Sequence, residues 1–252
     1  MFNLLIIDPQ NDFCDPKGSL QVQGAEGDMM VLARFIQKHK NEISSITVSL
    51  DQHKPLQIFH PLFWINKGGE HPKPFTTITL QDAQNGVWTP INKVDSNIAL
   101  QYLENLETRN KQTLTIWPLH CLIGSWGSSV YKHLSESLVS WSKYNHKNID
   151  WILKGSDVYS EQYSALKAES RVAVFNDFIL PDPAEPLYIA GEAFDFCVAS
   201  TVKDIIDNWR TWDKKDITIL EDCTSSIDKN NAEQIKKEFV SKGIKFAKVC
   251  DL

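Results

Sequence analysis

Three residues, far apart in the sequence, have the types and settings needed for nucleophilic catalysis. Cys197 lies in GEAFDFCVAS, at or near the first turn of a predicted helix. A helix N-terminus lowers the pKa of a thiol, and its N–H groups can hold a developing oxyanion. Asp8, in IIDPQNDFC, ends an apolar run and is suited to accept the thiol proton as a general base. Lys154, after DWIL, would lie beside both groups and favour their ionised forms.

A second group of residues has the spacing of metal ligands. Asp51 and His53 form a D-x-H pair, and side chains two apart on extended backbone lie on one face, where they can share an ion. A third ligand is needed, and the candidates are His60, His71 and His120, the last of which lies in WPLHC. One Asp and two His, with positions left for water, suit Zn²⁺ or Fe²⁺.

Four residues of these segments, which are Asp8, Asp51, Lys154 and the Gly191 of GEAFDFCVAS, directly follow predicted strands. In open parallel sheets, ligands bind outside the carboxyl ends of the strands, so these residues are expected to face one crevice. The strands and the residues that follow them are Asn3–Ile7 before Asp8, Ser45–Leu50 before Asp51, Asp150–Leu153 before Lys154, and Leu187–Ala190 before Gly191.

The rest of the chain alternates between strand and helix patterns. This alternation predicts an α/β fold with three αβα layers, in which helices cover both faces of a mainly parallel, six-stranded open sheet. The remaining expected strands are Ile217–Leu220 and Phe246–Val249, and Leu114–Trp117 is a strand or a buried loop. The expected helices are Met29–Lys38, Ala232–Lys242 and a helix with Val198, Val202, Ile205, Ile206 and Trp209 on one face.

The length of 252 residues and the absence of a low-complexity linker indicate a single domain over residues 1–252. One stretch, residues 66–110, is rich in Gly and Pro and is too long for an ordinary connection. It is expected to be an insertion and could form a lid over a site.

Composition excludes several classes of protein. The net charge is −6 and no basic stripe occurs, which argues against nucleic-acid binding. The apolar run Leu4–Ile7 is far too short for a signal peptide or a membrane span. The five cysteines are odd in number, scattered and free of CxxC pairs, as is typical of a reduced, cytoplasmic protein. A homo-oligomer is compatible with the sequence.

Five motifs occur together in a characteristic order: DPQNDFC followed by GSL, D-x-H, WPLHC followed by G-S-x-G, KG followed by YSAL, and GEAFDFCV. This order resembles the isochorismatase-like cysteine hydrolases, and most closely the nicotinamidases. The resemblance implies a triad of Asp8, Lys154 and Cys197. It also implies an oxyanion hole formed by the N–H groups of Ala193 and Cys197, with a cis peptide bond at Glu192–Ala193. The implied reaction hydrolyses nicotinamide to nicotinate and ammonia through a thioester.

The same resemblance implies one divalent metal ion, Zn or Fe, held by Asp51, His53 and His120. His60 matches a more variable fourth position. In nicotinamidases this metal binds the pyridine nitrogen and orients the ring. The reaction that the resemblance implies would belong to pyridine nucleotide salvage.

The expected substrate pocket departs from the family pattern. Phe13 and Trp117 match positions that flank the pyridine ring. Glu192, however, replaces an aliphatic residue, and Phe194 replaces a small polar residue near the pocket. A buried carboxylate at position 192 would be costly unless it is paired.

The sequence leaves alternative functions open, and the departures at Glu192 and Phe194 favour the first of them. Another amide or ureido hydrolase of the same superfamily would keep the triad and change the pocket. A non-catalytic binding protein on the same fold is the other alternative, although the retained triad and ligand residue types argue against it. A dinucleotide-binding redox domain is discounted because no G-x-G-x-x-G follows the first strand.

Overall fold

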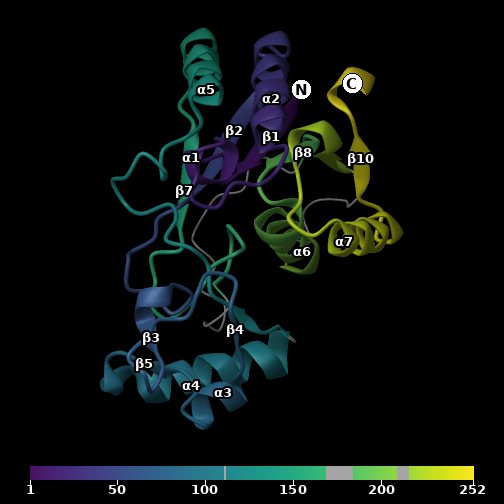
Figure 1. Cartoon of the computed structure of the whole chain (residues 1–252). Helices are drawn as coiled ribbons and strands as arrows, with labels where there is room; N and C mark the ends of the chain where they lie inside the picture. The colour runs from purple at the N-terminus through teal and green to yellow at the C-terminus, as the bar shows by residue number, and fades with distance from the viewer. Residues whose placement is uncertain (111, 169–183, 209–215) are drawn as a thin grey trace.

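A six-stranded parallel sheet forms the centre of the computed structural model, which describes residues 1–110, 112–168, 184–208 and 216–252 (Figure 1). Its strand order is β10-β9-β8-β1-β2-β7. The predicted mainly parallel sheet of six strands is therefore confirmed. The strands are β1 (Phe2–Ile7), β2 (Ile43–Asp51), β7 (Asp150–Lys154), β8 (Leu187–Gly191), β9 (Ile217–Leu220) and β10 (Lys245–Ala247).

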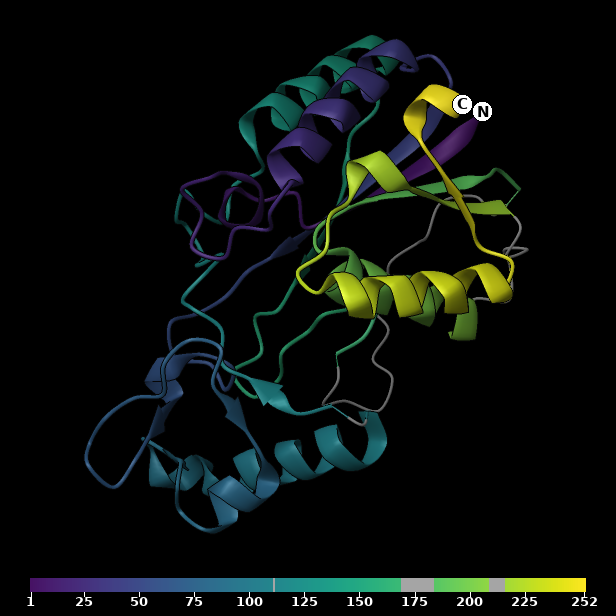
Figure 2. The same cartoon turned by 45° about the vertical axis from the view of Figure 1, so that its right-hand side comes forward.

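Helices cover both faces of this sheet. Helices α2 (Ala25–Lys38) and α5 (Lys132–Asn145) pack side by side on one face, and α6 (Ala199–Asn208) and α7 (Lys229–Ser241) lie on the other (Figure 2). Helices α2 and α7 begin earlier than their apolar patterns. Helix α7 starts after Asp228, whose side chain accepts hydrogen bonds from two backbone N–H groups of the first turn. Trp209, expected on the α6 face, lies outside the described residues. No helix in the described ranges is both long and apolar enough to span a membrane.

The central strand β1 shows how the core is built. All six of its residues are buried, as expected for a parallel strand with helices on both sides. Alternate side chains enter different clusters: Leu4 and Ile6 pack on the α2 side, and Leu5 and Ile7 pack on the α6 side. The sheet therefore separates two apolar layers. A polar site is expected at the ends of the central strands and not on the faces of the sheet.

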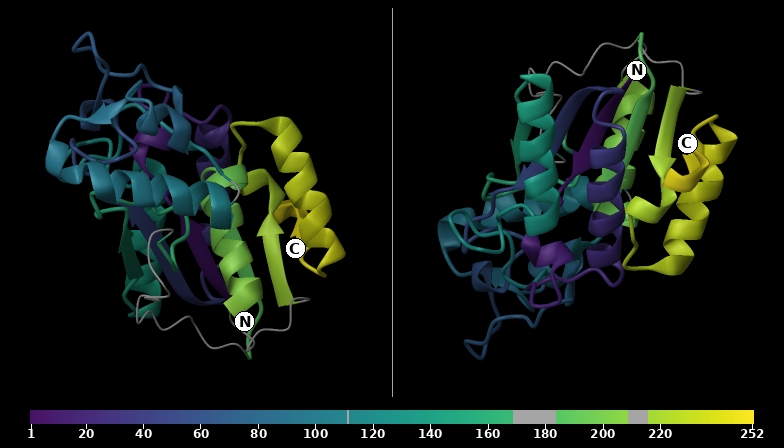
Figure 3. Two further views of the ribbon diagram at one scale, coloured as in Figure 1. Left: turned by 90° about the horizontal axis from the view of Figure 1, so that it is seen from below. Right: turned by 90° about the horizontal axis from the view of Figure 1, so that it is seen from above.

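The predicted insertion, residues 66–110, contains more regular structure than its composition suggested. It holds helices α3 (Leu80–Gln84) and α4 (Ser96–Asn105), and it lies beyond the carboxyl ends of the main strands (Figures 1 and 3). Two small antiparallel pairs, β3 (Trp64–Ile65) with β5 (Thr89–Pro90) and β4 (Thr77–Ile78) with β6 (Leu114–Thr115), tie it to the flanking chain. Leu114–Trp117 thus begins with a short strand outside the main sheet.

The remaining helical segments are short. They are α1 (Asn11–Cys14), η1 (Pro61–Phe63), η2 (Lys93–Asp95), η3 (Leu106–Asn110), η4 (Phe194–Val198), η6 (Glu221–Cys223) and η7 (Val249–Asp251).

Candidate active site

The predicted triad residues meet at the carboxyl edge of the sheet: Asp8 follows β1, Lys154 ends β7, and Cys197 lies in η4, shortly after β8. Strands β8, β1, β2 and β7 are neighbours in the sheet. The Nζ atom of Lys154 lies 2.8 Å from Oδ2 of Asp8 and 3.6 Å from Sγ of Cys197. All three residues are buried. Lys154 is therefore the group that joins the acid and the thiol.

Backbone features place Asp8 and Cys197 at this point. Ser49 on the neighbouring strand donates a hydrogen bond of 2.6 Å to Oδ1 of Asp8, which fixes the carboxylate. Gly191 ends β8 with a φ of +116°, and a Cβ there would lie 1.9 Å from the carbonyl oxygen of Ile7. Only glycine fits such an approach. The chain then turns through η4, which carries Cys197 and leads into α6.

Burial sets the protonation states of the triad. It raises the pKa of Asp8 to about 6, although Lys154 opposes the shift. Burial also raises the pKa of the Cys197 thiol well above its usual range, and the Lys154 ammonium only partly offsets this effect. The expectation that a helix N-terminus lowers this pKa is wrong, because desolvation of the thiolate outweighs the favourable charges. The resting thiol therefore keeps its proton and needs a base.

Three of the predicted metal ligands also cluster. Ligand atoms of Asp51, His53 and His120 lie within 4.8 Å of one another, and all three residues are buried. The His60 ring lies near the cluster, with its centroid 5.8 Å from that of His53 and 5.5 Å from that of His120. His71, the other candidate ligand from the sequence, lies in the 66–110 region, where its Nδ1 instead donates a hydrogen bond to the backbone carbonyl of Trp64.

The histidines are oriented as metal ligands are. The Nδ1 atoms of His53, His60 and His120 lie 2.8, 3.0 and 2.8 Å from backbone carbonyl oxygens. Each Nδ1 must therefore carry a proton, which leaves the Nε2 lone pair free for a metal. Nε2 of His60 is buried and has no hydrogen-bond partner among the described residues. Burial lowers the pKa of His60 to about 4, so its ring is neutral. This donor set fits a divalent cation such as Zn²⁺.

Gly155 makes room for this cluster. It follows Lys154 with a φ of +73°, and a Cβ at this position would lie 2.5 Å from Cε1 of His53. Its carbonyl oxygen is the acceptor for Nδ1 of His53. The KG motif therefore serves both the triad and the metal cluster.

A narrow cavity opens beside Cys197 and the histidines. Part of its wall is aromatic: the Phe196 ring lies 5.4 Å from Trp117 and 5.5 Å from Tyr163, centroid to centroid. Phe13 and Trp117, predicted from the sequence, both line it. The full lining is Phe13, Leu20, Val22, Asp51, His53, Trp117, His120, Glu161, Gln162, Tyr163, Ala193, Phe196, Cys197 and Ile227.

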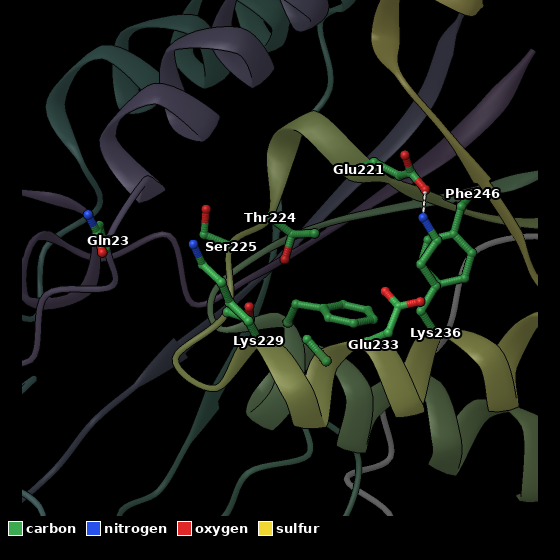
Figure 4. Close-up of a pocket in the computed structure, with 11 residues that line it drawn as sticks. Gln23, Glu221, Thr224, Ser225, Lys229, Glu233, Lys236 and Phe246 are labelled. Carbon is green, nitrogen blue, oxygen red and sulfur yellow. Dashed lines mark hydrogen bonds and ion pairs between the residues drawn. The ribbon is translucent and has the colours of Figure 1, made fainter.

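Two sequence-based concerns about this cavity, the bulk of Phe194 and the 66–110 insertion, have structural answers. Phe194 is not among the residues that line it; its ring packs against Phe246, with centroids 5.9 Å apart. Phe194 lines a separate hollow of about 460 Å³ between the 224–226 loop and α7 (Figure 4). No described residue of 66–110 lines the cavity beside Cys197. The insertion instead contacts a residue that lines the cavity: the N–H of Glu161 donates a hydrogen bond to the hydroxyl of Tyr102.

The fold and this geometry agree with those of known proteins. No family model matches the sequence. The nicotinamidase of Saccharomyces cerevisiae is 24% identical over 203 residues, which are 80% of this chain and 79% of the relative. The solved structure of the yeast nicotinamidase superposes with a TM-score of 0.69 at 23% identity, covering 98% of this chain and 99% of that chain. The chain has the nicotinamidase fold.

A more distant nicotinamidase-fold structure includes a metal. The pyrazinamidase of Pyrococcus horikoshii in complex with zinc has a TM-score of 0.61 at 20% identity, and 98% of each chain is covered. The resemblance to the nicotinamidases that was inferred from the five motifs is confirmed.

Several residues that build this nicotinamidase-like site were not assigned from the sequence. Gln10 accepts a hydrogen bond from Asp51 N–H and donates to its carbonyl. Asp12 accepts from the N–H of Cys121 at 2.6 Å and so holds the His120 loop. Tyr163 lines the cavity. Gln10 and Asp12 lie in DPQNDFC and Tyr163 lies in YSAL, so the motifs contained the signal but not the contacts.

Proposed function

We propose that the protein is a cysteine amidohydrolase that converts nicotinamide to nicotinate and ammonia. The observation that carries the proposal is the buried contact of Lys154 with both Asp8 and Cys197, beside an aromatic cavity that reaches the histidine cluster. The names of the relatives support it, since the yeast protein is a nicotinamidase and one of its structures is bound to the inhibitor nicotinaldehyde. A flat pyridine ring suits a pocket with aromatic walls.

The acylation step follows from the protonation states. At neutral pH, Asp8 is mostly ionised because its pKa is about 6, whereas the Cys197 thiol is protonated. Asp8 accepts the thiol proton while Sγ forms a bond to the amide carbon and the carbonyl oxygen becomes an oxyanion. When the oxyanion collapses, the C–N bond breaks and Asp8 returns the proton to the departing ammonia.

Deacylation reverses these roles with water. Asp8 takes a proton from water as the water oxygen attacks the thioester carbon, and the C–S bond breaks. The proton then returns to Sγ, which restores the thiol and releases the acid product. Lys154 keeps its charge throughout, because the carboxylates of Asp51 and Asp8 outweigh its burial and raise its pKa.

Donors for the oxyanion are available at the end of β8. Among the described residues, the N–H of Ala193 has no hydrogen-bond acceptor in the chain. Ala193 lines the cavity together with Cys197. We propose that the N–H groups of these two residues form the oxyanion hole.

We further propose that Asp51, His53 and His120 hold one divalent ion, Zn or Fe, with His60 as a fourth ligand. Such an ion would act as a Lewis acid that grips the ring nitrogen of the substrate. We also propose a cytoplasmic location, because all five cysteines are unpaired.

Release of ammonia from nicotinamide by the purified protein tests the proposal. The Cys197→Ala variant should lose several powers of ten in kcat with an unchanged thermal unfolding temperature, whereas Cys250→Ala, at an exposed thiol, should retain full activity. If nicotinamide is untouched but other carboxamides are hydrolysed in a Cys197-dependent way, the enzyme class stands and the substrate is wrong. An active Cys197→Ala variant would overturn the class.

A further inference from the structure

Glu192 is a buried carboxyl group that has no cationic partner in the part of the chain that the structure describes. It follows β8 directly and its exposed fraction is 0%. The charged groups that influence it are the acids Asp28 and Asp195. A buried carboxylate with only acidic neighbours is costly, so the surroundings of Glu192 need an explanation.

Among these acids, Asp28 on α2 affects Glu192 most. Both carboxyl groups accept hydrogen bonds from the same residue, Ser225, so they lie side by side, and Oε1 of Glu192 has no N–H or hydroxyl donor among the described residues. Two carboxyl groups can hydrogen-bond each other only when one of them carries a proton. Burial, followed by the charge of Asp28, raises the pKa of Glu192 well above its usual range. Glu192 is thus the protonated member.

Ser225 ties this pair to the segment that carries Ala193. Its N–H donates to Oε2 of Glu192 at 3.1 Å, and its hydroxyl donates to Oδ2 of Asp28 at 2.5 Å. Its carbonyl accepts from the N–H of Phe194 at 2.7 Å. Ser225 therefore grips the chain on both sides of Ala193, from the loop that Figure 4 shows entering α7.

We propose that Glu192 and Asp28 share one proton and that this carboxyl pair is a positioning device for the Ala193 N–H. The inference rests on the proposed function, in which that N–H binds the oxyanion. Glu192 does not touch the substrate cavity; it acts through Ser225 and the backbone. An aliphatic residue, which the family pattern predicts here, could not make these contacts.

The pair should respond to rising pH. The groups around it are Asp28 and Asp195, the nearby Asp222, and the thiols of Cys14 and Cys223, whose pKa values its charge raises. None of them is a cation, so loss of the shared proton puts two uncompensated charges together. Because the folded pKa of Glu192 is raised, its stability contribution is present at low pH and is lost as pH rises through that value.

Infrared difference spectroscopy on the substrate-free enzyme detects the proton. At about pH 8, a pKa near 6 leaves only about 1% of Asp8 protonated. We expect a carbonyl band of a protonated carboxylic acid in the wild type that the Glu192→Gln variant lacks. Asp28→Asn should also remove the band, because the Asn amide donates to an ionised Glu192. A wild type without the band would overturn the shared proton.

Kinetics test the positioning role. Glu192→Gln keeps a neutral group that can donate to Asp28 and accept from Ser225, so its kcat should stay within about threefold of the wild type. The loss of stability with rising pH should disappear in this variant. Glu192→Val should lower kcat at least about tenfold with KM nearly unchanged, because oxyanion donors act in the transition state. Wild-type kcat in Glu192→Val, or a loss in Glu192→Gln equal to that in Glu192→Val, would overturn the role.

The two measurements separate the inference from the proposed function. The infrared band and the stability profile need no substrate, so they stand even if nicotinamide is not hydrolysed. If Glu192→Val fails to fold, Asp28→Asn replaces it: it should lose the band and lower kcat, since the ionised Glu192 beside Ala193 disfavours an oxyanion.

Discussion

The ammonium group of Lys154 lies 2.6 Å from Oδ1 of Asp51 and so connects the triad to the candidate metal cluster. The same nitrogen lies 2.8 Å from Asp8. One buried cation therefore compensates two buried carboxylates, of which one belongs to each half of the site. The cross-strand register places Asp51 and Lys154 side by side on β2 and β7. This arrangement leads to a stability prediction as well as a catalytic one.

Replacing Lys154 by Met should inactivate the enzyme and destabilise the metal-free protein by about 3–5 kcal/mol, because it leaves buried carboxylates uncompensated. In the variant, the pKa values of Asp8 and Asp51 rise, since the Lys154 ammonium group no longer opposes the effect of burial. Their stability contribution is then present below their ordinary pKa and is lost as pH rises. Denaturant unfolding between about pH 4 and pH 7 should show this loss.

Lys17→Met is the matched control, because Lys17 is exposed. It should unfold like the wild type at each pH. A Lys154→Met protein as stable at neutral as at acidic pH would contradict the prediction.

The pH dependence of kcat/KM should reveal Asp8. Its pKa of about 6 predicts that the rate falls as pH falls through this value, because a protonated carboxyl group cannot accept the thiol proton. The Ser49 hydroxyl, 2.6 Å from Oδ1 of Asp8, stabilises the carboxylate. Ser49→Ala should therefore move the acid limb upward by about one pH unit, the equivalent of a hydrogen bond to a charged group of about 1.5 kcal/mol.

Ser45 offers the control on the same strand. Its hydroxyl donates to Oδ1 of Asn3, away from the site. Ser45→Ala should leave the acid limb in place, and an equal shift in both variants would mean that Asp8 is not the group that titrates.

Much of the catalytic edge could be predicted because strand ends are local features. Asp8, Asp51, Lys154 and Gly191 each follow an apolar run, and the parallel sheet brings such positions to one edge. The strand order could not be read from these runs, since pairing depends on how the crossovers pack. Helix α5 was missed because its buried face, Leu134, Leu138 and Trp141, is diluted by polar residues.

Side-chain direction was the other limit. Phe194 was expected near the substrate, but the chain turns at η4 and sends its ring toward Phe246. The pKa of Cys197 was expected to be lowered, but its value depends on burial that a sequence does not report. Both errors concern the three-dimensional surroundings of a correctly located segment.

The metal prediction is one divalent ion per chain. Elemental analysis of unchelated protein should find it, and His53→Ala should weaken binding at least about 100-fold, the upper range for loss of a mere supporting group. His60→Ala should weaken it less, since His60 falls outside the tightest cluster. Competition with a chromogenic chelator measures both effects.

His71→Ala serves as the control, because His71 bonds the Trp64 carbonyl away from the cluster. It should bind metal as the wild type does. Metal-free wild-type protein with full activity in strong chelator would refute the role of the ion.

Phe194 and Phe196 lie two residues apart and should behave in opposite ways. The Phe196 ring contacts Trp117 and Tyr163 in the cavity wall, so Phe196→Leu should raise KM for nicotinamide about tenfold, which corresponds to loss of an aromatic contact of about 1.4 kcal/mol. Its effect on stability should be small because the ring is only partly buried. Phe194 is buried in the α6 layer, so Phe194→Leu should lower the free energy of unfolding by about 1–2 kcal/mol while KM stays unchanged. Steady-state ammonia release and urea unfolding of the two variants give both quantities. If Phe194→Leu changes KM and Phe196→Leu does not, the ring that faces the substrate has been assigned to the wrong side of η4.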